Sequence, residues 1–205
     1  HANDPKDADG DGTTARVSMA FHLRTFNPSD PEFPPDVEAA TRVRYIWNEW
    51  LPNIVLYGNV DADPDGKLDG AADISGSEAL KGRLDYFGVN YYSDTIIAAH
   101  AGLVVPKIDA SVQQDNLPTG RPRSDFGWDI YPEGFGEVLR SLKRYKLPVM
   151  VLENGIADAR DQNRTRFLAE HLYELGRAIQ DGVPIVGYMH WSLLDNFEWA
   201  SGFCP

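Results

Sequence analysis

Residues 147–191 read LPVMVLENGIADARDQNRTRFLAEHLYELGRAIQDGVPIVGYMHW, and this stretch decides the fold class. Two short apolar runs each follow a proline, at residues 149–152 and 185–191. Between the two runs, apolar residues recur at the spacing of one helix face: Phe167, Leu168, Leu172, Leu175 and Ile179. The order strand, helix, strand predicts two parallel strands joined by a crossover, because a tight hairpin cannot join a parallel pair.

The same rhythm extends toward the amino terminus. Residues 16–23 and 84–92 predict two further strands, and residues 135–142 predict another helix. Residues 37–50 have near-helical apolar spacing after several prolines, whereas residues 57–82 are rich in Gly and Asp and predict a surface excursion. Four parallel strands with crossover helices indicate an α/β fold, either a covered sheet or part of a barrel.

A complete (β/α)8 barrel takes about 250 residues, more than the 205 of this chain. We therefore expect the carboxy-terminal half of a TIM barrel, about four β/α units without the final helix, as one partial domain over residues 1–205. The sequence starts at His1 rather than Met, so we also expect that it is a piece of a longer protein whose amino-terminal half is absent.

Composition excludes several classes of partner. The formal net charge is -12, which repels phosphate backbones and anionic lipid surfaces, so we expect no nucleic-acid partner. No apolar stretch reaches the ~20 residues that span a bilayer, so we expect no membrane partner. Cys204 is the single cysteine, which excludes an internal disulfide and a zinc site built on paired cysteines.

Polar and aromatic residues follow the predicted strands. In a parallel barrel the functional side chains lie at the carboxyl ends of strands, where the connecting loops meet. Asn90 and Tyr92 end one predicted strand, Glu153 ends the next, and Trp191 ends the last, with Glu198 and Trp199 shortly after it. A tyrosine hydroxyl can orient a carboxylate without neutralising it, and tryptophan faces match the C–H faces of sugar rings. This pattern is typical of a sugar pocket.

Four strings together resemble glycoside hydrolase family 1, the β-glucosidases and β-galactosidases, in that family's order. They are LDYFGVNYY (84–92), DFGWDIYPEG (125–134), VLENG (151–155) and GYMHWSLLDNFEWASG (187–202). The similarity is strong from about residue 84 onward and faint before it. The resemblance implies a retaining β-glycosidase that acts on β-linked glucosides or galactosides, with a saccharide or glycoside as its small-molecule partner and without an organic cofactor.

Residue by residue, the resemblance implies a catalytic pair, with Glu153 as the nucleophile and Tyr92 as its hydrogen-bond donor. It implies a substrate-binding set of Asn90, Trp128, Trp191, Glu198 and Trp199, with no metal ligand. Trp128 would flank the leaving group, or it would cover the barrel rim without touching ligand. Read alone, Glu-Asn-Gly is a turn signal, and the tryptophans are core aromatics. We interpret His190 as a core histidine on a buried strand.

The second carboxyl group of the mechanism is not evident. In the family the acid/base glutamate belongs to an Asn-Glu-Pro motif, which this sequence lacks. Asn48-Glu49 is followed by Trp50 inside a predicted helix, so we reject it. We expect the acid/base residue just upstream of residue 1, an isolated chain of low activity, and open strand edges that need the amino-terminal half of the barrel.

An alternative of another class comes from acidic loops. Asp61, Asp63, Asp65 and Asp69 alternate around Gly66, and residues 7–11 form a weaker copy. Alternating carboxylates can converge on calcium, although both loops lack the glutamate that closes such a motif. The alternative is therefore a calcium-dependent carbohydrate-binding module without catalysis, with solvated acidic turns as the simpler interpretation.

Overall fold

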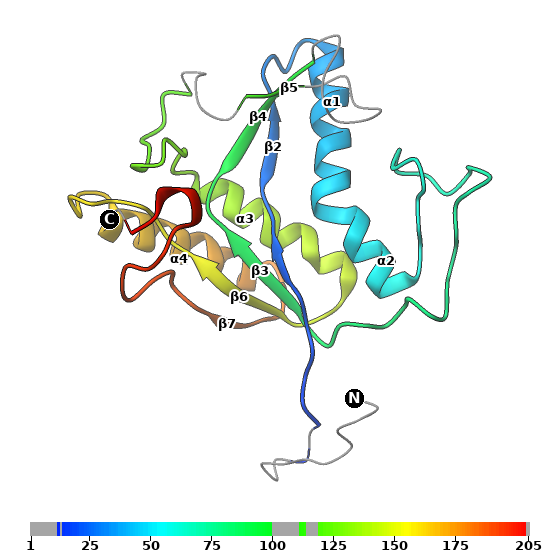
Figure 1. Ribbon diagram of the computed structural model, residues 1–205. Coiled ribbons are helices and arrows are strands. Elements are labelled where there is room, and N and C mark those ends of the chain that lie inside the picture. Colours follow the sequence, from blue (N-terminus) through cyan, green and yellow to red (C-terminus); the bar gives the residue numbers. More distant parts are fainter. Residues whose placement is uncertain (1–11, 13, 100–110, 114–118, 204–205) are drawn as a thin grey trace.

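The computed structural model describes residues 12, 14–99, 111–113 and 119–203. Its main sheet has four parallel strands in the spatial order β1, β3, β6, β7. Their bounds are Ala20–His22, Phe87–Tyr91, Val149–Asn154 and Ile185–Tyr188. Helices α3 (Pro132–Ser141) and α4 (Arg164–Gln180) supply the later crossovers and pack beside the sheet (Figure 1). The predicted strand-and-helix order and the partial α/β barrel are confirmed.

The core lies between the main sheet and its helices. Val149 and Val151 of β6 are fully buried, whereas Met150 and Leu152, on the opposite side of the strand, are half-buried. This alternation is the period of two that a strand imposes on its side chains. The buried valines belong to one hydrophobic cluster with residues of β3 and α3, including Phe87, Val89, Phe135 and Leu139.

A second, smaller sheet continues beyond the main one. Strands β2 (Thr25–Pro28) and β4 (Asp94–Ala98) pair in parallel, and β5 (Ser111–Gln113) pairs antiparallel with β4. Two residues separate β1 from β2, and two residues separate β3 from β4. The segments β1–β2 and β3–β4 therefore run side by side past the end of the main sheet (Figure 1). The sequence patterns did not predict this extension.

The predicted helix over residues 37–50 is part of a longer helical run. It comprises α1 (Pro34–Arg44), a π-helix (Tyr45–Trp50) and α2 (Leu51–Tyr57). Val37 and Trp47, which we expected on the apolar face, are 40% and 52% exposed, whereas Asp36 is buried. Asp36 accepts the backbone N–H groups of Asp30 and Ala99, so its buried carboxylate is satisfied.

Other predicted elements exist with shorter bounds. The strand predicted over residues 16–23 is reduced to β1, and the one over 84–92 to β3. Residues 58–82 contain turns and an isolated bridge from Val60 to Ile74, which confirms the predicted surface excursion. Two 3₁₀ turns, Leu142–Tyr145 and Trp199–Ser201, complete the elements that the structure describes.

The main sheet ends at β1 on one side and at β7 on the other within the described ranges. The β7 residues Val186 and, just beyond the strand, Met189 are 58% and 49% exposed. Near β1, Val17 and Met19 are 48% and 42% exposed. Among the helices described, none combines the length and the apolar character needed to cross a bilayer.

Candidate active site

Three strand ends bring the candidate residues together. Asn90 on β3 lies opposite Glu153 on β6 in the parallel ladder. Beyond β7, the backbone N–H of Trp191 donates to the carbonyl oxygen of Asn154 at 3.0 Å, and Trp191 forms a bridge with Gly155. The carboxyl ends of β3, β6 and β7 are therefore adjacent, as the position of the candidates in the sequence predicted.

Glu153 accepts a hydrogen bond from a tyrosine. The Tyr92 Oη donates to the Glu153 Oε2 at 2.6 Å, although the residues are 61 positions apart in the chain. Burial and this hydrogen bond raise the pKa of Tyr92 far above its usual range, so the phenol stays protonated and remains a donor at any working pH. Among the described residues, the hydrogen bond to Glu153 uses Oε2, so the pair holds an oriented carboxylate whose Oε1 is left for chemistry.

A cavity of about 600 Å³ opens beside this pair. Its wall includes Glu153, Tyr92, Trp128, Trp191, Glu198 and Trp199, together with His22 from β1. A concave site of this size that combines aromatic faces with a few polar groups is suited to a small ligand. Six of the seven predicted site residues line this one cavity.

The last part of the cavity wall comes from the loop after β7. Trp191 is partly buried, and its Nε1 lies 3.4 Å from the Oε1 of Glu198, a long donor–acceptor contact. Trp199 begins a 3₁₀ turn and is 83% exposed. Both tryptophans therefore line the cavity, Trp191 partly buried and Trp199 largely exposed to solvent.

Trp128 lines the cavity from the segment before α3. Its ring lies 5.8 Å from that of Tyr92 and 5.4 Å from that of Phe126, measured between centroids. The guanidinium carbon of the buried Arg24 lies 5.6 Å from the Trp128 ring centroid. Trp128 is therefore a member of the cavity wall and belongs to an aromatic cluster beside the nucleophile candidate.

Asn90 is placed differently from the other candidates. It is half-buried beside Glu153 but is not among the residues that line the cavity. Its Oδ1 is buried and accepts no hydrogen bond from the residues that the structure describes. A buried amide oxygen without a donor costs free energy unless a water or a ligand satisfies it.

The sequence matches the family model described as "Glycosyl hydrolase family 1" over residues 1–204. The chain belongs to glycosyl hydrolase family 1. It is 46% identical over 192 residues to a β-galactosidase of Sulfolobus acidocaldarius, a match that covers 91% of this chain and 36% of the relative. It is 40% identical to a 1,4-β-D-glucan glucohydrolase of Thermotoga neapolitana, covering 92% of this chain and 46% of that protein.

Solved structures of family 1 enzymes share the fold. A β-glycosidase from Pyrococcus horikoshii superposes with a TM-score of 0.77 at 26% sequence identity, covering 92% of this chain and 41% of that one. A family 1 β-glucosidase from Thermotoga maritima gives a TM-score of 0.75 at 26% identity, covering 92% and 44%. The chain thus spans less than half the length of these proteins, and it corresponds to part of a family 1 barrel.

Asn48-Glu49 is not a site for the family's acid/base residue. Both residues lie in the π-helix, where the side chain of Asn48 exchanges hydrogen bonds with the backbone of Arg24. Glu49 forms ion pairs with Arg44 and Arg144 at 3.4 and 3.1 Å. These partners give both residues structural roles, in agreement with their rejection on sequence grounds.

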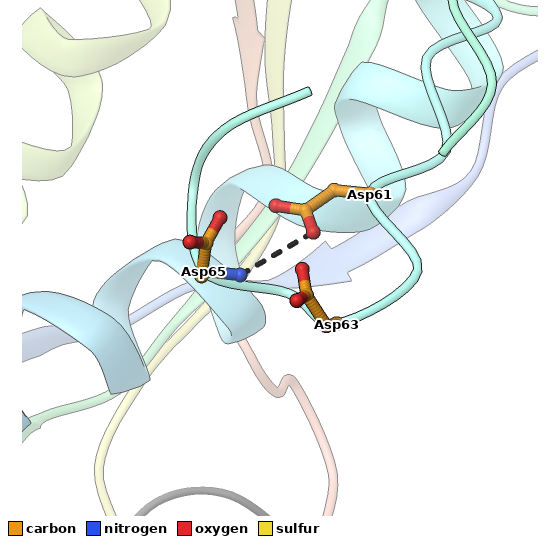
Figure 2. Close-up of side chains that lie close together, drawn as sticks. All are labelled: Asp61, Asp63 and Asp65. Carbon is orange, nitrogen blue, oxygen red and sulfur yellow. Dashed lines mark hydrogen bonds between the residues drawn. The ribbon is translucent and has the colours of Figure 1, made fainter. Parts of the chain in front are cut away.

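The acidic loop converges in part. Asp61, Asp63 and Asp65 each bring one carboxylate oxygen within 4.8 Å of the others, as Figure 2 shows. Asp69 is not part of this group. The buried Asp61 already accepts the backbone N–H groups of Asp65 at 3.3 Å and Gly66 at 2.8 Å, so its carboxylate also closes the turn. The weaker copy at residues 7–11 lies outside the described residues.

Two histidines lie in places that the sequence did not predict. We interpreted His190 as a core histidine on a buried strand, which is wrong for the described residues, because β7 is the outermost strand of their main sheet and His190 is half-buried beyond it. His22, which we did not predict as a site residue, lies at the carboxyl end of β1 and lines the cavity. The rule that selected Glu153, a polar residue at a strand end, would also have selected His22.

Proposed function

We propose that this chain contributes the nucleophile side of a retaining β-glycosidase site, with Glu153 as the nucleophile. The observation that carries the proposal is the 2.6 Å hydrogen bond from Tyr92 to Glu153 at the rim of an aromatic-walled cavity. One Glu153 oxygen is held by the phenol, and the other is available to attack. Trp191 supports the sugar ring, and Glu198 and Trp199 bind its hydroxyl edge. The buried Oδ1 of Asn90, which has no donor among the described residues, accepts a hydrogen bond from a hydroxyl or a water beside the nucleophile.

The mechanism requires two carboxyl groups about 5–5.5 Å apart. The Glu153 carboxylate bonds to the anomeric carbon as the bond to the glycosidic oxygen breaks, and the second carboxyl group gives its proton to that oxygen. The second group, now a carboxylate, takes a proton from water while the water oxygen displaces Glu153. Tyr92 keeps Glu153 oriented through both steps.

The substrates are β-linked glycosides. The relatives named as a β-galactosidase and as a 1,4-β-D-glucan glucohydrolase support hydrolysis of β-glycosides by the whole protein. Trp128 flanks the leaving group, a role supported by its place in the cavity wall and by its ring contact with Tyr92. No organic cofactor takes part in the proposed steps.

The second carboxyl group comes from the amino-terminal half of a barrel. The exposed apolar residues Val17, Met19, Val186 and Met189 at the two sheet edges support pairing with further strands. The isolated chain is therefore poorly active on ordinary glycosides, whose leaving groups need protonation. A substrate with an activated leaving group depends less on that proton and tests the nucleophile separately.

The test uses an activated 2-deoxy-2-fluoro glycoside, which traps the glycosyl-enzyme intermediate. The chain is incubated alone, and also co-expressed with the amino-terminal segment of the S. acidocaldarius β-galactosidase that precedes the matched region. Peptide mass spectrometry then locates the adduct. We expect it on Glu153. Labelling of another residue, or no labelling in an assembled barrel that melts cooperatively, would remove Glu153 from this role.

A calcium-dependent carbohydrate-binding module is the second candidate, because three carboxylates converge at Asp61, Asp63 and Asp65. Isothermal titration with calcium, with and without a disaccharide, separates the two functions. Sugar binding that disappears on chelation would favour the module. Sugar binding that is unchanged by chelation but lost in Glu153→Ala favours the glycosidase.

A further inference from the structure

A row of aromatic rings leads from the π-helix to the nucleophile candidate. Trp47 donates its Nε1–H to the backbone carbonyl of His22 at 2.6 Å, and the two rings meet edge to face with centroids 6.2 Å apart. His22 in turn meets the Tyr92 ring edge to face, at 5.9 Å and 86°. Trp47 thus contacts His22, and His22 contacts Tyr92, whose phenol donates to Glu153.

The His22 ring has few polar interactions of its own. Its Nε2 is buried and has no hydrogen-bond partner within the described part of the chain. Burial, together with the charge of Arg24, lowers the pKa of His22 to about 4, so the ring is neutral at working pH. The ring is thus held mainly by its strand and by its contacts with Trp47 and Tyr92. Its effect on these neighbours is steric packing, without a charge.

Tyr92 needs such support because it lies beyond the end of β3, in the two-residue link to β4. The hydrogen bond to Glu153 fixes only the tip of the side chain. The ring itself is held by two aromatic contacts, with His22 and with Trp128 at 5.8 Å. Loss of the His22 ring would leave space into which the phenol could tilt, and small misplacements at a reacting centre are costly.

We propose that His22 is a positioning residue that keeps the Tyr92 phenol aimed at Glu153. The inference rests on the proposed role of Glu153 and extends it to a residue of another strand. It gives a function to the π-helix as well, since Trp47 fixes the backbone of His22. Local widening of a helix into a π-turn is frequent near functional sites.

Direct contact with the leaving group is the competing role, because His22 also lines the cavity. A β-glycosyl fluoride separates the two roles, since it has no aglycone. A positioning residue affects the turnover of the fluoride and of aryl glycosides alike. A residue that only contacts the aglycone affects the aryl glycosides and leaves the fluoride unchanged.

The experiment compares His22→Ala with His22→Phe in the assembled barrel. For His22→Ala we expect kcat on the glycosyl fluoride to fall roughly 10-fold or more, with KM changed less. The acidic limb of the pH–rate profile should move to higher pH, because a carboxylate with a weakened donor is protonated more readily. His22→Phe keeps an aromatic edge against Tyr92 and should stay within about threefold of the original chain.

Phe26→Ala is the matched control. Phe26 also packs edge to face against Trp47, at 6.3 Å, but it does not line the cavity. Its removal should leave the pH–rate profile in place even if it lowers stability. A profile that moves as much in Phe26→Ala as in His22→Ala would reduce His22 to a general structural role and overturn the proposal.

A double-mutant cycle tests whether His22 acts through Tyr92. In a Tyr92→Phe background, His22→Ala should lower kcat by much less than tenfold, because the hydrogen bond that His22 supports is already absent. If the two substitutions lower kcat independently, so that their effects on the activation free energy add in the double variant, the proposal is contradicted. If Glu153 is labelled by the fluoro glycoside but the His22 variants behave like the original chain, the inference fails while the proposed function stands.

A measurement without turnover covers the case of an inactive assembly. Tyrosine labelled with ¹³C at Cζ reports the environment of the phenol, and the Tyr92 signal is identified by its absence in Tyr92→Phe. We expect this signal to shift in His22→Ala and to stay close to its original position in His22→Phe and Phe26→Ala. A Tyr92 signal indifferent to all three substitutions would overturn the proposal.

Discussion

Asn90 lies directly opposite Glu153 in the ladder between β3 and β6, although Val89, its neighbour, lies opposite Val151. Leu152 is thus an extra residue on β6, and the ladder shifts by one position at the end of the strand. Such a bulge bends the strand and turns the following side chain. Since Val151 is fully buried on one side of β6, the irregularity helps to bring Glu153 to the cavity rim beside Tyr92.

The first prediction concerns the nucleophile itself. Glu153→Gln keeps the volume of the side chain but removes the charge that attacks, so kcat in the assembled barrel should fall by more than about 10⁴-fold. Steady-state hydrolysis of an aryl β-glycoside measures this. Glu78→Gln, which neutralises an exposed carboxylate of the surface excursion before β3 and does not line the cavity, is the control and should retain near-normal kcat.

The second prediction concerns the donor. Tyr92→Phe removes the hydrogen bond to Glu153 while keeping the ring contacts with His22 and Trp128. A hydrogen bond to a charged group contributes about 1.5–3 kcal/mol, so kcat/KM should fall roughly 10- to 100-fold. The acidic limb of its pH dependence should move upward. An unchanged profile would show that the phenol does not hold the attacking carboxylate.

The third prediction concerns the loop after β6. The Oδ2 of Asp158 accepts the backbone amides of Asn163 and Arg164 at 2.6 and 3.1 Å, at the start of α4. Burial opposes ionisation of Asp158, but amide hydrogen bonds, with Gln162 as a third donor, outweigh it and lower its pKa.

Asp158→Ala should therefore destabilise the chain by about 1–2 kcal/mol at neutral pH, as the loss of a helix cap does. Because the folded-state pKa lies below the unfolded one, the contribution is present above about pH 4 and disappears as the pH falls further. Urea unfolding of both chains at pH 7 and at pH 3 measures the difference. If the difference in unfolding free energy between the original chain and Asp158→Ala is the same at both pH values, this account is contradicted.

The fourth prediction concerns His171, which is fully buried on α4 and stacks on Phe167 at 3.7 Å. Burial lowers its pKa to about 4, against an ordinary value of 6.5. The folded state thus favours the neutral ring. The contribution of His171 to the free energy of unfolding is fully present above pH 6.5 and is lost as the pH falls toward 4. His171→Asn removes this proton uptake.

Between pH 6 and pH 4.5, the free energy of unfolding should change less steeply with pH in His171→Asn than in the original chain. One titrating group changes the slope by at most about 1.4 kcal/mol per pH unit. The pKa of His22 is also lowered in the fold, so His22 still contributes to the pH dependence of the unfolding free energy in the variant. Equal slopes in the two proteins would show that His171 is not held neutral by the fold.

The fifth prediction concerns the open edges of the main sheet. The chain alone should self-associate, because β1 and β7 present unpaired backbone beside exposed apolar side chains. Addition of an amino-terminal half-barrel should convert the aggregates into a one-to-one complex in size-exclusion chromatography. A chain that elutes alone as a cooperatively melting monomer would count against the need for that half.

Much of the main sheet was predictable because its signals are local. Apolar runs after Pro148 and Pro184, with helical spacing between them, are sufficient to place β6, α4 and β7. Strand-end polarity drew attention to Glu153 and Trp191, and the roles predicted for them came from the family resemblance. These features need no information about distant parts of the chain.

The parts that could not be predicted depend on long-range packing. Strands β2 and β4 are short and gain their structure by pairing with each other, 69 positions apart at Thr25 and Asp94. The buried face of α1 includes Asp36, a charged residue whose partners come from elsewhere in the chain. The role of His22 depends on three segments meeting, which a single-sequence pattern does not contain.

The extension of β1 and β3 into the second sheet has an evolutionary consequence. On that side of the cavity the strands leaving the barrel remain paired, so an insertion after His22 or Tyr91 would break a ladder. The segment at residues 192–198 carries no such ladder. Length variation among descendants of this sequence should therefore accumulate in the segment after β7, where an insertion interrupts no ladder.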